Sequence, residues 1–291
     1  MILSQSVQNI LWQMGIQEVP CSIEPFQNAE DGSSYSVWKI QLNDQILVLK
    51  EAKGHEIATY REFFTEKYPY APKLLATTKA GDKAYLLTEY CPGTDLRHCT
   101  RDRLILVLDS LIAMQRQWWG SVPKAEGWHY VQSLPGRRNR LHYLKDPQLE
   151  AVYCAFLRCY ESLPHTLCHD DLLPFNVLCS QDNAVFIDWE YGGILPYLTS
   201  LARLIAHGEE SEDAFFYMRQ EDKTFAATYY YDHFIKEMGI PKAEYQLSLQ
   251  LFLFYEYCEW IYVGNKFNNT ETQRFKDSFN KAKQLAKNLG Y

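Results

Sequence analysis

Two short stretches of the chain carry polar residues at spacings that suit phosphoryl transfer. His169, Asp171 and Asn176 form the pattern His-x-Asp-x-x-x-x-Asn, and Asp188 follows twelve residues after Asn176. Transfer of a phosphoryl group from ATP needs a carboxylate at the acceptor hydroxyl and oxygen ligands that hold Mg²⁺ against the phosphates. We therefore expect Asp171 to face the hydroxyl, and Asn176 and Asp188 to bind the metal.

The elements around these residues must bring the two stretches together. The apolar run 184–187 ends at Asp188 and predicts a short buried strand. Protein-kinase catalytic loops use the same frame from His to Asn. The loop could instead be an ordinary polar turn, but the strand that ends in a carboxylate disfavours this alternative.

Segment 167–205 resembles the aminoglycoside phosphotransferase and choline kinase family, which are small-molecule relatives of the protein kinases. The family pattern is His-Gly-Asp-Leu-His-Pro-Gly-Asn, a strand, Ile-Asp-Trp/Phe-Glu and a Gly. Matching positions are Leu172, Pro174, Asn176, 187–193, 196–197 and 201–204. The chain departs from the pattern at three places: Asp170 and Phe175 replace the two glycines, and Ser200 stands where Asp is common.

The resemblance implies an α+β, protein-kinase-like fold of two lobes. A small antiparallel sheet with one main helix would form the nucleotide-binding lobe, residues 1–90, and a larger helical lobe, residues 91–291, would carry catalysis and substrate binding. It also implies ATP and Mg²⁺ as cofactors and a small-molecule hydroxyl as acceptor. His169 is expected to brace the catalytic loop rather than to transfer protons.

The hydrophobic pattern predicts elements that fit this division. The first lobe is expected to contain helices at 1–15 and 55–67 and strands at 22–26, 35–42, 45–50, 72–77 and 84–90. The second is expected to contain helices at 101–119, 146–162, 197–207, 211–220, 224–238, 243–262 and 270–288. The basic segment 135–140 is interpreted as a solvated loop.

A kinase-like site also needs a lysine on the third strand to bind the ATP phosphates. Lys50 ends the apolar strand 46–49, and the family resemblance places the phosphate-binding lysine there. A lysine on a buried strand requires a paired carboxylate. Glu56 is the preferred partner and Glu62 the alternative; Lys50 could also be a plain surface residue at a strand end.

Two further segments are expected to contact the nucleotide. The polar insert 27–34 would cover the phosphates, with Ser33 and Ser34 as donors, although it has a single glycine and could be a plain hairpin. Residues 86–90 resemble the hinge between kinase lobes, where backbone groups near Glu89 and Tyr90 would face adenine.

The acceptor is predicted from an aromatic and acidic helix near the C-terminus. Aromatic faces with carboxylates suit an amine or a quaternary ammonium group, so we favour choline or a related amino alcohol. Aminoglycosides, sugars and thiamine stay open, as does a core helix that has a wet edge. The predicted substrate-binding residues are Tyr255, Glu256, Glu259, Trp260, Trp189, Tyr191 and Glu190, the last with a structural salt bridge as its alternative.

Bulk composition limits the classes of partner that we expect for this protein. The 291 residues are 47% hydrophobic and carry a net charge of −7, which disfavours nucleic acid as a partner. The N-terminus lacks the features of a signal peptide and no apolar run reaches membrane-spanning length, so we expect a cytoplasmic protein without a membrane partner. The eight cysteines include no Cys-x-x-Cys pair and are expected to be reduced.

Three other classes compete with a small-molecule kinase. One is an inactive nucleotide-binding module of the same fold. A protein kinase is disfavoured because Asp188-Trp189-Glu190 replaces Asp-Phe-Gly and the segment 192–201 is too short for an activation loop. A metal hydrolase that uses His165, His169 and the adjacent aspartates is disfavoured because Pro164 precludes a ligand-bearing helix there.

Overall fold

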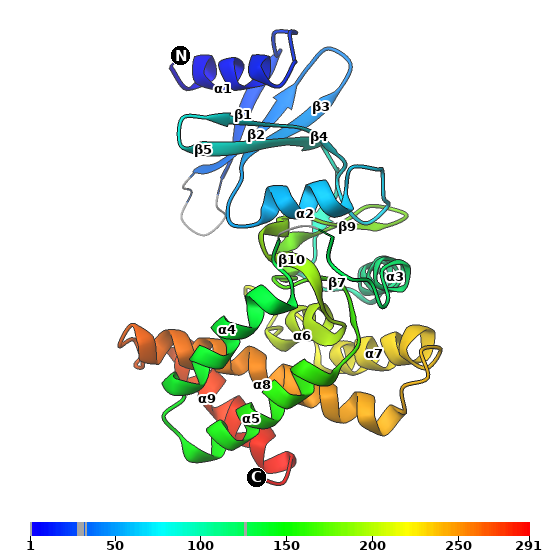
Figure 1. Cartoon of the computed structure of the whole chain (residues 1–291), viewed down its shortest axis with the longest axis vertical. Helices are drawn as coiled ribbons and strands as arrows, with labels where there is room; N and C mark the ends of the chain where they lie inside the picture. Colours follow the sequence, from blue (N-terminus) through cyan, green and yellow to red (C-terminus); the bar gives the residue numbers. More distant parts are fainter. Residues whose placement is uncertain (1, 28–31, 33, 125–126) are drawn as a thin grey trace.

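The computed structural model of the chain describes residues 2–27, 32, 34–124 and 127–291. A small lobe built on a sheet lies above a larger, mainly helical lobe along the long axis of the molecule (Figure 1). The elements of the small lobe are α1 (Ile2–Gln13), β1 (Ser22–Gln27), β2 (Ser34–Gln41), β3 (Ile46–Glu51), α2 (Glu56–Phe63), β4 (Leu74–Ala80) and β5 (Lys83–Glu89).

The larger lobe follows β5. Its strands are β6 (Thr94–Asp95), β7 (His165–His169), β8 (Val177–Cys179), β9 (Ala184–Phe186) and β10 (Gly192–Pro196). Its α-helices are α3 (Arg101–Gln117), α4 (Tyr130–Arg140), α5 (Pro147–Ser162), α6 (Leu198–Ala206), α7 (Gln220–Tyr230), α8 (Lys242–Lys266) and α9 (Gln273–Asn288). Single turns of 3₁₀-helix lie at Leu141–Tyr143, Pro174–Asn176 and Trp189–Tyr191, and a π-helical turn at Tyr231–Ile235 follows α7.

The five strands of the small lobe form an antiparallel sheet in the order β1-β2-β3-β5-β4. Successive side chains of a strand point to opposite faces. On β3, Leu47 and Leu49 are buried on the face that α1 covers, and Figure 1 shows α1 across the end of the lobe far from the helical lobe. Lys50 therefore projects from the opposite face, toward α2.

Two short strand pairs position the polar loops of the larger lobe. β7 pairs with β10, with His169 opposite Gly192, and β8 pairs with β9, with Val177 opposite Phe186. The amide of Ile187 also donates to the carbonyl of Asn176 at 3.0 Å. The loop after β7 and the residues after β9 consequently lie side by side below the small lobe.

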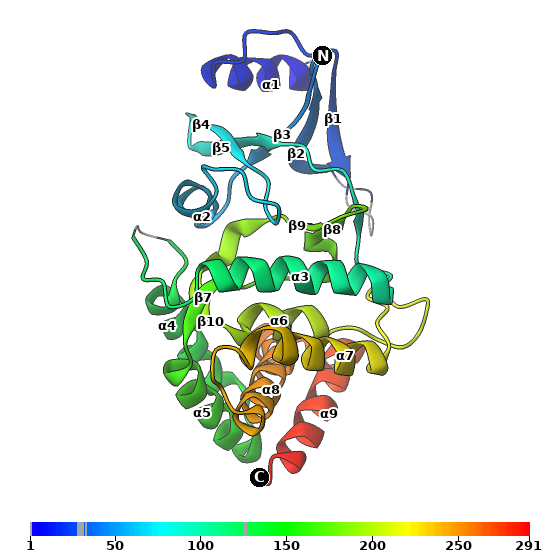
Figure 2. The same ribbon diagram turned by 90° about the vertical axis from the view of Figure 1, so that its right-hand side faces the viewer.

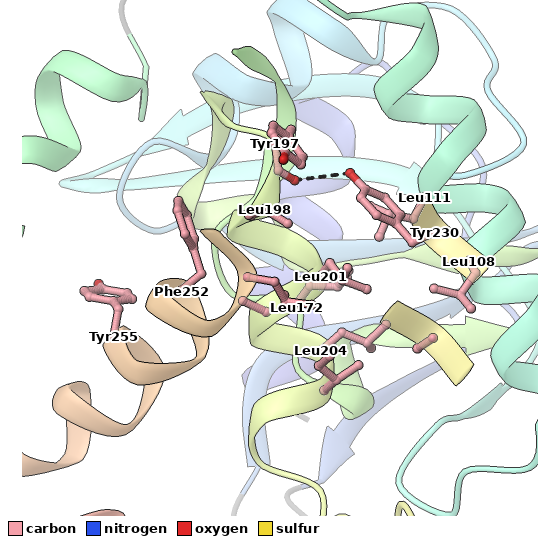
Figure 3. Close-up of a cluster of buried hydrophobic side chains, with 14 of the residues drawn as sticks. Leu108, Leu111, Leu172, Tyr197, Leu198, Leu201, Leu204, Tyr230, Phe252 and Tyr255 are labelled. Carbon is pink, nitrogen blue, oxygen red and sulfur yellow. Dashed lines mark hydrogen bonds between the residues drawn. The ribbon is translucent and has the colours of Figure 1, made fainter. Parts of the chain in front are cut away.

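The helices of the larger lobe bury a continuous apolar core under these loops. Figure 2 shows α3 between the small lobe and the layer that contains α6 and α7. Leu172, which follows Asp171, is fully buried in this core beside Leu201 and Leu204 of α6 (Figure 3). The catalytic-loop segment is therefore anchored by an apolar side chain next to its central carboxylate.

The predicted α+β architecture with a sheet lobe and a helical lobe is confirmed. β5 ends at Glu89, and the next strand, β6, already pairs with β8 of the larger lobe. We therefore propose the division into residues 1–90 and 91–291. None of the helices in the described ranges combines the length and the apolar character that crossing a bilayer requires. The eight cysteines all lie in those ranges and form no disulfide.

Two local predictions are wrong. Residues 211–219 form turns and bends instead of a helix, because backbone hydrogen bonds from Glu209 to Phe216 and from Met218 to Glu209 close the segment on itself. The basic segment 135–140 belongs to α4 and not to a solvated loop. Its Arg137 is only 2% exposed, since an ion pair with Asp170 offsets the burial of its charge.

Candidate active site

A cavity of about 1050 Å³ lies between the two lobes. Its lining includes six polar residues that the sequence singles out for phosphate binding, pairing with Lys50, catalysis, metal binding or substrate binding. They are Lys50, Glu56, Asp171, Asn176, Asp188 and Glu190. The cavity continues along the larger lobe to α8 and α9, where Tyr257, Trp260, Arg274 and Lys281 line it.

Lys50 joins the two lobes through two ion pairs. Its Nζ lies 2.8 Å from Glu56 Oε1 on α2 and 2.6 Å from Asp188 Oδ1 in the larger lobe. The predicted pairing of Lys50 with Glu56 is thus present. The alternative partner, Glu62, instead accepts a hydrogen bond from the backbone amide of Lys124 at 2.7 Å.

Burial and charge act against each other in this trio. Burial works to lower the pKa of Lys50, but the charges of Glu56 and Asp188 outweigh it and leave the pKa raised. Burial raises the pKa of Glu56 to about 7, despite the opposing charge of Lys50. Burial also works to raise the pKa of Asp188, but the charge of Lys50 holds it below its usual value. Asp188 is therefore ionised at neutral pH.

The catalytic loop is fixed by its own backbone and by α6. The side-chain amide of Asn176 donates to the carbonyl of Asp171 at 2.8 Å. The amide of His169 donates to Ser200 Oγ at 2.8 Å, so the hydroxyl at the position where the family commonly has Asp binds the loop backbone. His169 Nε2 lies 2.7 Å from the carbonyl of Ile187.

The side chain of His169 is buried behind the loop and contacts the backbone of Ile187. Its ring is fully buried and packs on Trp189 with 4.6 Å between ring centroids. Burial lowers the pKa of His169, so the ring is neutral near pH 7 and donates from Nε2 to Ile187. His169 is absent from the lining of the cavity within the described residues.

Asp188 and Asn176 fit a divalent cation that also contacts nucleotide phosphates. Lys50 occupies Oδ1 of Asp188, and Asn176 uses its amide nitrogen toward Asp171, which leaves one side-chain oxygen on each residue. Asp188 adopts a left-handed backbone conformation, with φ of 65°, which turns its side chain relative to β9. The described residues contain no cluster of three His, Cys, Asp or Glu that could hold a metal by itself. A cation here would depend on phosphate oxygens and water for its other ligands.

Comparison with known proteins identifies the family of the chain. The family model described as the phosphotransferase enzyme family matches residues 26–232. The chain belongs to the phosphotransferase enzyme family. Its match to Protein LicA of Haemophilus influenzae has 36% identity over 67 residues, which is 23% of this chain and 20% of that protein. The chain thus aligns with about a fifth of the length of that relative.

Solved structures share the fold of this chain at low sequence identity. A choline/ethanolamine kinase family protein from Mesorhizobium loti has a TM-score of 0.64 and 14% identity, covering 98% of this chain and 95% of that chain. The amicoumacin kinase hAmiN in complex with AMP-PNP, Ca²⁺ and Ami has a TM-score of 0.60 and 12% identity, covering 98% and 92%. These similarities support the kinase-like fold of this phosphotransferase.

Of the three departures from the family pattern, Asp170 has a partner network of its own. Arg137 Nη2 and Trp128 Nε1 donate to its two carboxylate oxygens at 2.5 and 2.7 Å. Arg137 also lies over the ring of Tyr160 at 4.6 Å from the centroid. Asp170 therefore points into the larger lobe and binds α4, while Asp171 faces the cavity of the phosphotransferase.

Only some of the residues predicted to contact the nucleotide line the cavity. Ser33 lies outside the described residues. Ser34 is exposed at the start of β2, and among the described residues Tyr35 and Ser36 line the cavity in its place. Glu89 and Tyr90 line the cavity, but their amides donate to the carbonyls of Lys73 and Ile46.

Two aromatic residues predicted to bind substrate lie in the core. Trp189 is fully buried, packs on Phe64 and donates its indole N–H to the carbonyl of Phe186 at 2.7 Å. Tyr255 is 5% exposed and stacks on Phe156, with 4.5 Å between ring centroids. Neither ring is part of the cavity lining, and their burial excludes direct contact with a ligand in this conformation.

The predicted acids of α8 are already paired. Glu256 is buried and binds Arg203 and His207, at 2.8 and 3.1 Å. Glu259 binds Arg140 of α4. Both carboxylates therefore link helices of the larger lobe, and neither lines the cavity within the described residues. Helical spacing correctly indicates a polar face but does not show which partner that face meets.

Trp260 and Glu190 do reach the cavity. The ring of Trp260 carries the guanidinium of Arg274 at 4.3 Å from its centroid, so a cation of the protein already occupies one aromatic face. Glu190 packs against Gly54, where a Cβ would meet its Cγ at 2.8 Å. The described residues provide no ion pair for Glu190. Tyr191 is half-exposed beside Trp128, with 5.4 Å between ring centroids, outside the lining.

The structure adds residues that the sequence did not indicate. Phe215 and Phe216 meet Phe175 in a group of three rings, with centroid distances of 4.7 to 6.3 Å, and all three line the cavity; we call this group the phenyl cluster. Glu209 lines the cavity at the other end of the same turn. The pair Phe215-Phe216 within a polar stretch is the sequence signal that could have indicated these residues. The prediction of a helix at 211–220 gave the pair no separate role.

Proposed function

We propose that this phosphotransferase moves the γ-phosphoryl group of ATP to a hydroxyl group of a small molecule. The observation that carries the proposal is the convergence of Lys50, Asp188 and Asp171 on one cavity between the lobes. Their positions reproduce the division of work that phosphoryl transfer requires, namely phosphate binding, metal binding and alignment of the nucleophile. The solved kinase hAmiN, whose complex contains AMP-PNP and Ca²⁺, supports a nucleotide with a divalent metal.

Each residue has a distinct part in the proposed reaction. Lys50, held by Glu56, binds phosphate oxygens of ATP. Asp188 and Asn176 supply the protein oxygens for Mg²⁺, which when bound neutralises charge on the phosphates. Asp171 accepts a hydrogen bond from the acceptor hydroxyl, aligns its oxygen with the γ-phosphorus and receives its proton late.

The adenine ring is proposed to bind at the hinge through Cys91. The amides of Glu89 and Tyr90 already donate to backbone carbonyls, so they are not free for a base. Cys91 is the next residue along the hinge and lines the cavity. Among the described residues its amide has no backbone partner. This assignment moves the predicted adenine contact by one residue.

An amino alcohol such as choline or ethanolamine is the proposed acceptor. The similarity to a choline/ethanolamine kinase family protein supports this class. Arg97 lies over the ring of Phe215 at 5.6 Å from its centroid, so Phe175 and Phe216 are the rings of the phenyl cluster proposed to meet a cation. Glu190 and Glu209 add negative charge along the same cavity, and rings together with carboxylates attract cations. This surface differs from the predicted one, which combined Tyr255, Glu256, Glu259 and Trp260 of the C-terminal helix with Trp189, Glu190 and Tyr191.

The test is a screen for ADP release with ATP and Mg²⁺ over choline, ethanolamine, thiamine, sugars and aminoglycosides. We expect acceptor-dependent ADP release that is highest for an amino alcohol and that falls by about 10² to 10⁴ in Asp171→Asn. Preferred turnover of another acceptor would replace the amino alcohol and leave the kinase proposal in place. ATP binding without turnover of any acceptor would support an inactive nucleotide-binding protein, and phosphate on a protein would support a protein kinase.

A further inference from the structure

Arg203 of α6 holds one oxygen of the central carboxylate with two donors. Its Nε and Nη2 both donate to Asp171 Oδ1, at 3.0 and 2.7 Å. The other oxygen, Oδ2, has no hydrogen-bond donor among the described residues. Asp171 lines the cavity. Oδ2 is therefore the oxygen left for the acceptor hydroxyl.

Arg203 is itself fixed from its far side. Its Nη1 donates to Glu256 Oε2 on α8 at 2.8 Å, and Glu256 is 4% exposed. His207 Nε2 lies 3.1 Å from the same oxygen. A guanidinium is planar and its donors have a fixed fork geometry. Bonds to carboxylates at both ends thus define the plane of Arg203 and, through it, the orientation of Asp171.

The charges of this group leave Asp171 able to accept a hydrogen bond. Arg203 lies between two carboxylates, so Asp171 and Glu256 share the positive charge of the guanidinium. Burial lowers the pKa of His207, which leaves that ring neutral near pH 7. The three groups Asp171, Arg203 and Glu256 consequently carry a net negative charge, and of the three Asp171 lines the cavity.

Two residues of α6 support different parts of the loop that follows β7. Ser200 binds the backbone of His169, and Arg203, one helical turn later, binds the side chain of Asp171. Arg203 lies in the stretch 201–204 that matches the family, but the sequence assigned it no role. Sequence spacing could not show that Arg203 and Asp171, 32 residues apart, are paired.

We infer that Arg203 is a positioning residue for phosphoryl transfer: it directs Oδ2 of Asp171 at the acceptor hydroxyl, with Glu256 as its anchor. The inference rests on the proposed function, because it concerns the alignment that the reaction needs. A misplacement of about 1 Å of a reacting group can cost about a hundredfold in rate. If Arg203 only joined α6 to α8, its substitution would lower stability and would leave the rate of the chemical step unchanged.

The experiment compares Arg203→Lys, Asp171→Asn and the double variant with the wild type. Lysine keeps the charge, but its single ammonium group cannot supply the fork that reaches both carboxylates. For Arg203→Lys we expect kcat to fall by about tenfold or more, with Kd for ATP and KM for the acceptor within about twofold. The double variant is expected to have the kcat of Asp171→Asn alone, since Arg203 acts through that carboxylate.

Arg101 provides a matched control. Its Nε and Nη2 donate to one oxygen of the buried Asp222, at 2.8 and 2.5 Å, in the same arrangement as Arg203 and Asp171. Arg101 does not line the cavity within the described residues. Arg219 also binds Asp222, at 2.9 Å, so Arg101→Lys is expected to lower the melting temperature no more than Arg203→Lys does and to keep wild-type kcat.

Each possible result either supports or refutes the positioning role of Arg203. Wild-type kcat in Arg203→Lys, or a double variant whose loss is the product of the two single losses, would overturn it while the kinase proposal stands. Absence of turnover by the wild type would reject the proposed function and the inference together. If Arg203→Lys does not fold, Glu256→Gln is measured instead: a lower kcat at unchanged ATP affinity supports the anchor, and an unchanged kcat refutes it.

Discussion

The proposed phosphate end and the proposed acceptor end of the cavity are built differently. At the phosphate end, Lys50 and Asp171 each bind charged partners within 3.0 Å, and Asn176 binds backbone. At the acceptor end, the phenyl cluster presents apolar rings, of which those of Phe175 and Phe215 are more than a third exposed. Fixed polar geometry suits a reaction that many substrates share, whereas exposed rings on a turn are easily changed and suit the choice of acceptor.

The two ends also differ in how directly they follow from local sequence. The polar residues of the phosphate end stand at strand ends, where the pleat and a short loop fix their direction. The rings of the acceptor end come from the catalytic loop and from the turn 209–218, which meet only in the folded chain. This contrast leads to predictions that separate catalysis from selectivity.

The largest expected effect is at the metal-binding carboxylate. Asp188→Asn should lower phosphoryl transfer by about a hundredfold or more, because it removes a charge that holds the metal at the phosphates. Asparagine tolerates the left-handed backbone at this position, so the melting temperature should stay near that of the wild type. Steady-state kinetics and thermal unfolding measure the two effects, and retained turnover would remove Asp188 from the phosphate end.

A smaller effect, on stability, is expected at Lys50. Folding raises the pKa of Glu56 from 4.5 to about 7, so the stability that its proton provides is lost as pH rises through this range. Lys50→Met removes the cation that offsets the ionised form, which raises that pKa further. The variant should therefore lose more stability at pH 8 than at pH 5, by about 3 kcal/mol.

Denaturant unfolding of both proteins at the two pH values measures this difference. The expected result is a gap in the free energy of unfolding that widens with pH. A gap that is equal at pH 5 and pH 8 would show that the charge of Glu56 does not depend on Lys50. Glu56→Gln is the control, because it removes the titrating group and should remove the widening.

The smallest expected effect is at the acceptor end. Phe215→Ala should raise the KM for the acceptor by about tenfold, equivalent to the loss of one apolar contact, with unchanged affinity for ATP. Phe267→Ala is the matched control, since Phe267 is 66% exposed and lies outside the cavity lining of the described residues. Equal effects of the two substitutions would exclude the phenyl cluster from acceptor binding.

The sequence by itself determined the family and the fold class, and it predicted the chemistry that we propose. The pattern from His169 to Asn176 and the carboxylate after β9 are local, and a strand on either side fixes how they project. Lys50 and Glu56 were found for the same reason, because a strand and the next helix bring residues six apart together.

Only the tertiary structure decided the partners of the charged and aromatic side chains. Arg203 pairs with Asp171 across 32 residues, Arg137 with Asp170 across 33, and Phe175 meets a turn forty residues away. The same packing buries Trp189 and Tyr255, whose sequence pattern also fits a ligand cage. Helical and strand periodicity specify which face of an element is apolar, but the energy of burying a charge or a ring depends on the distant group that it meets.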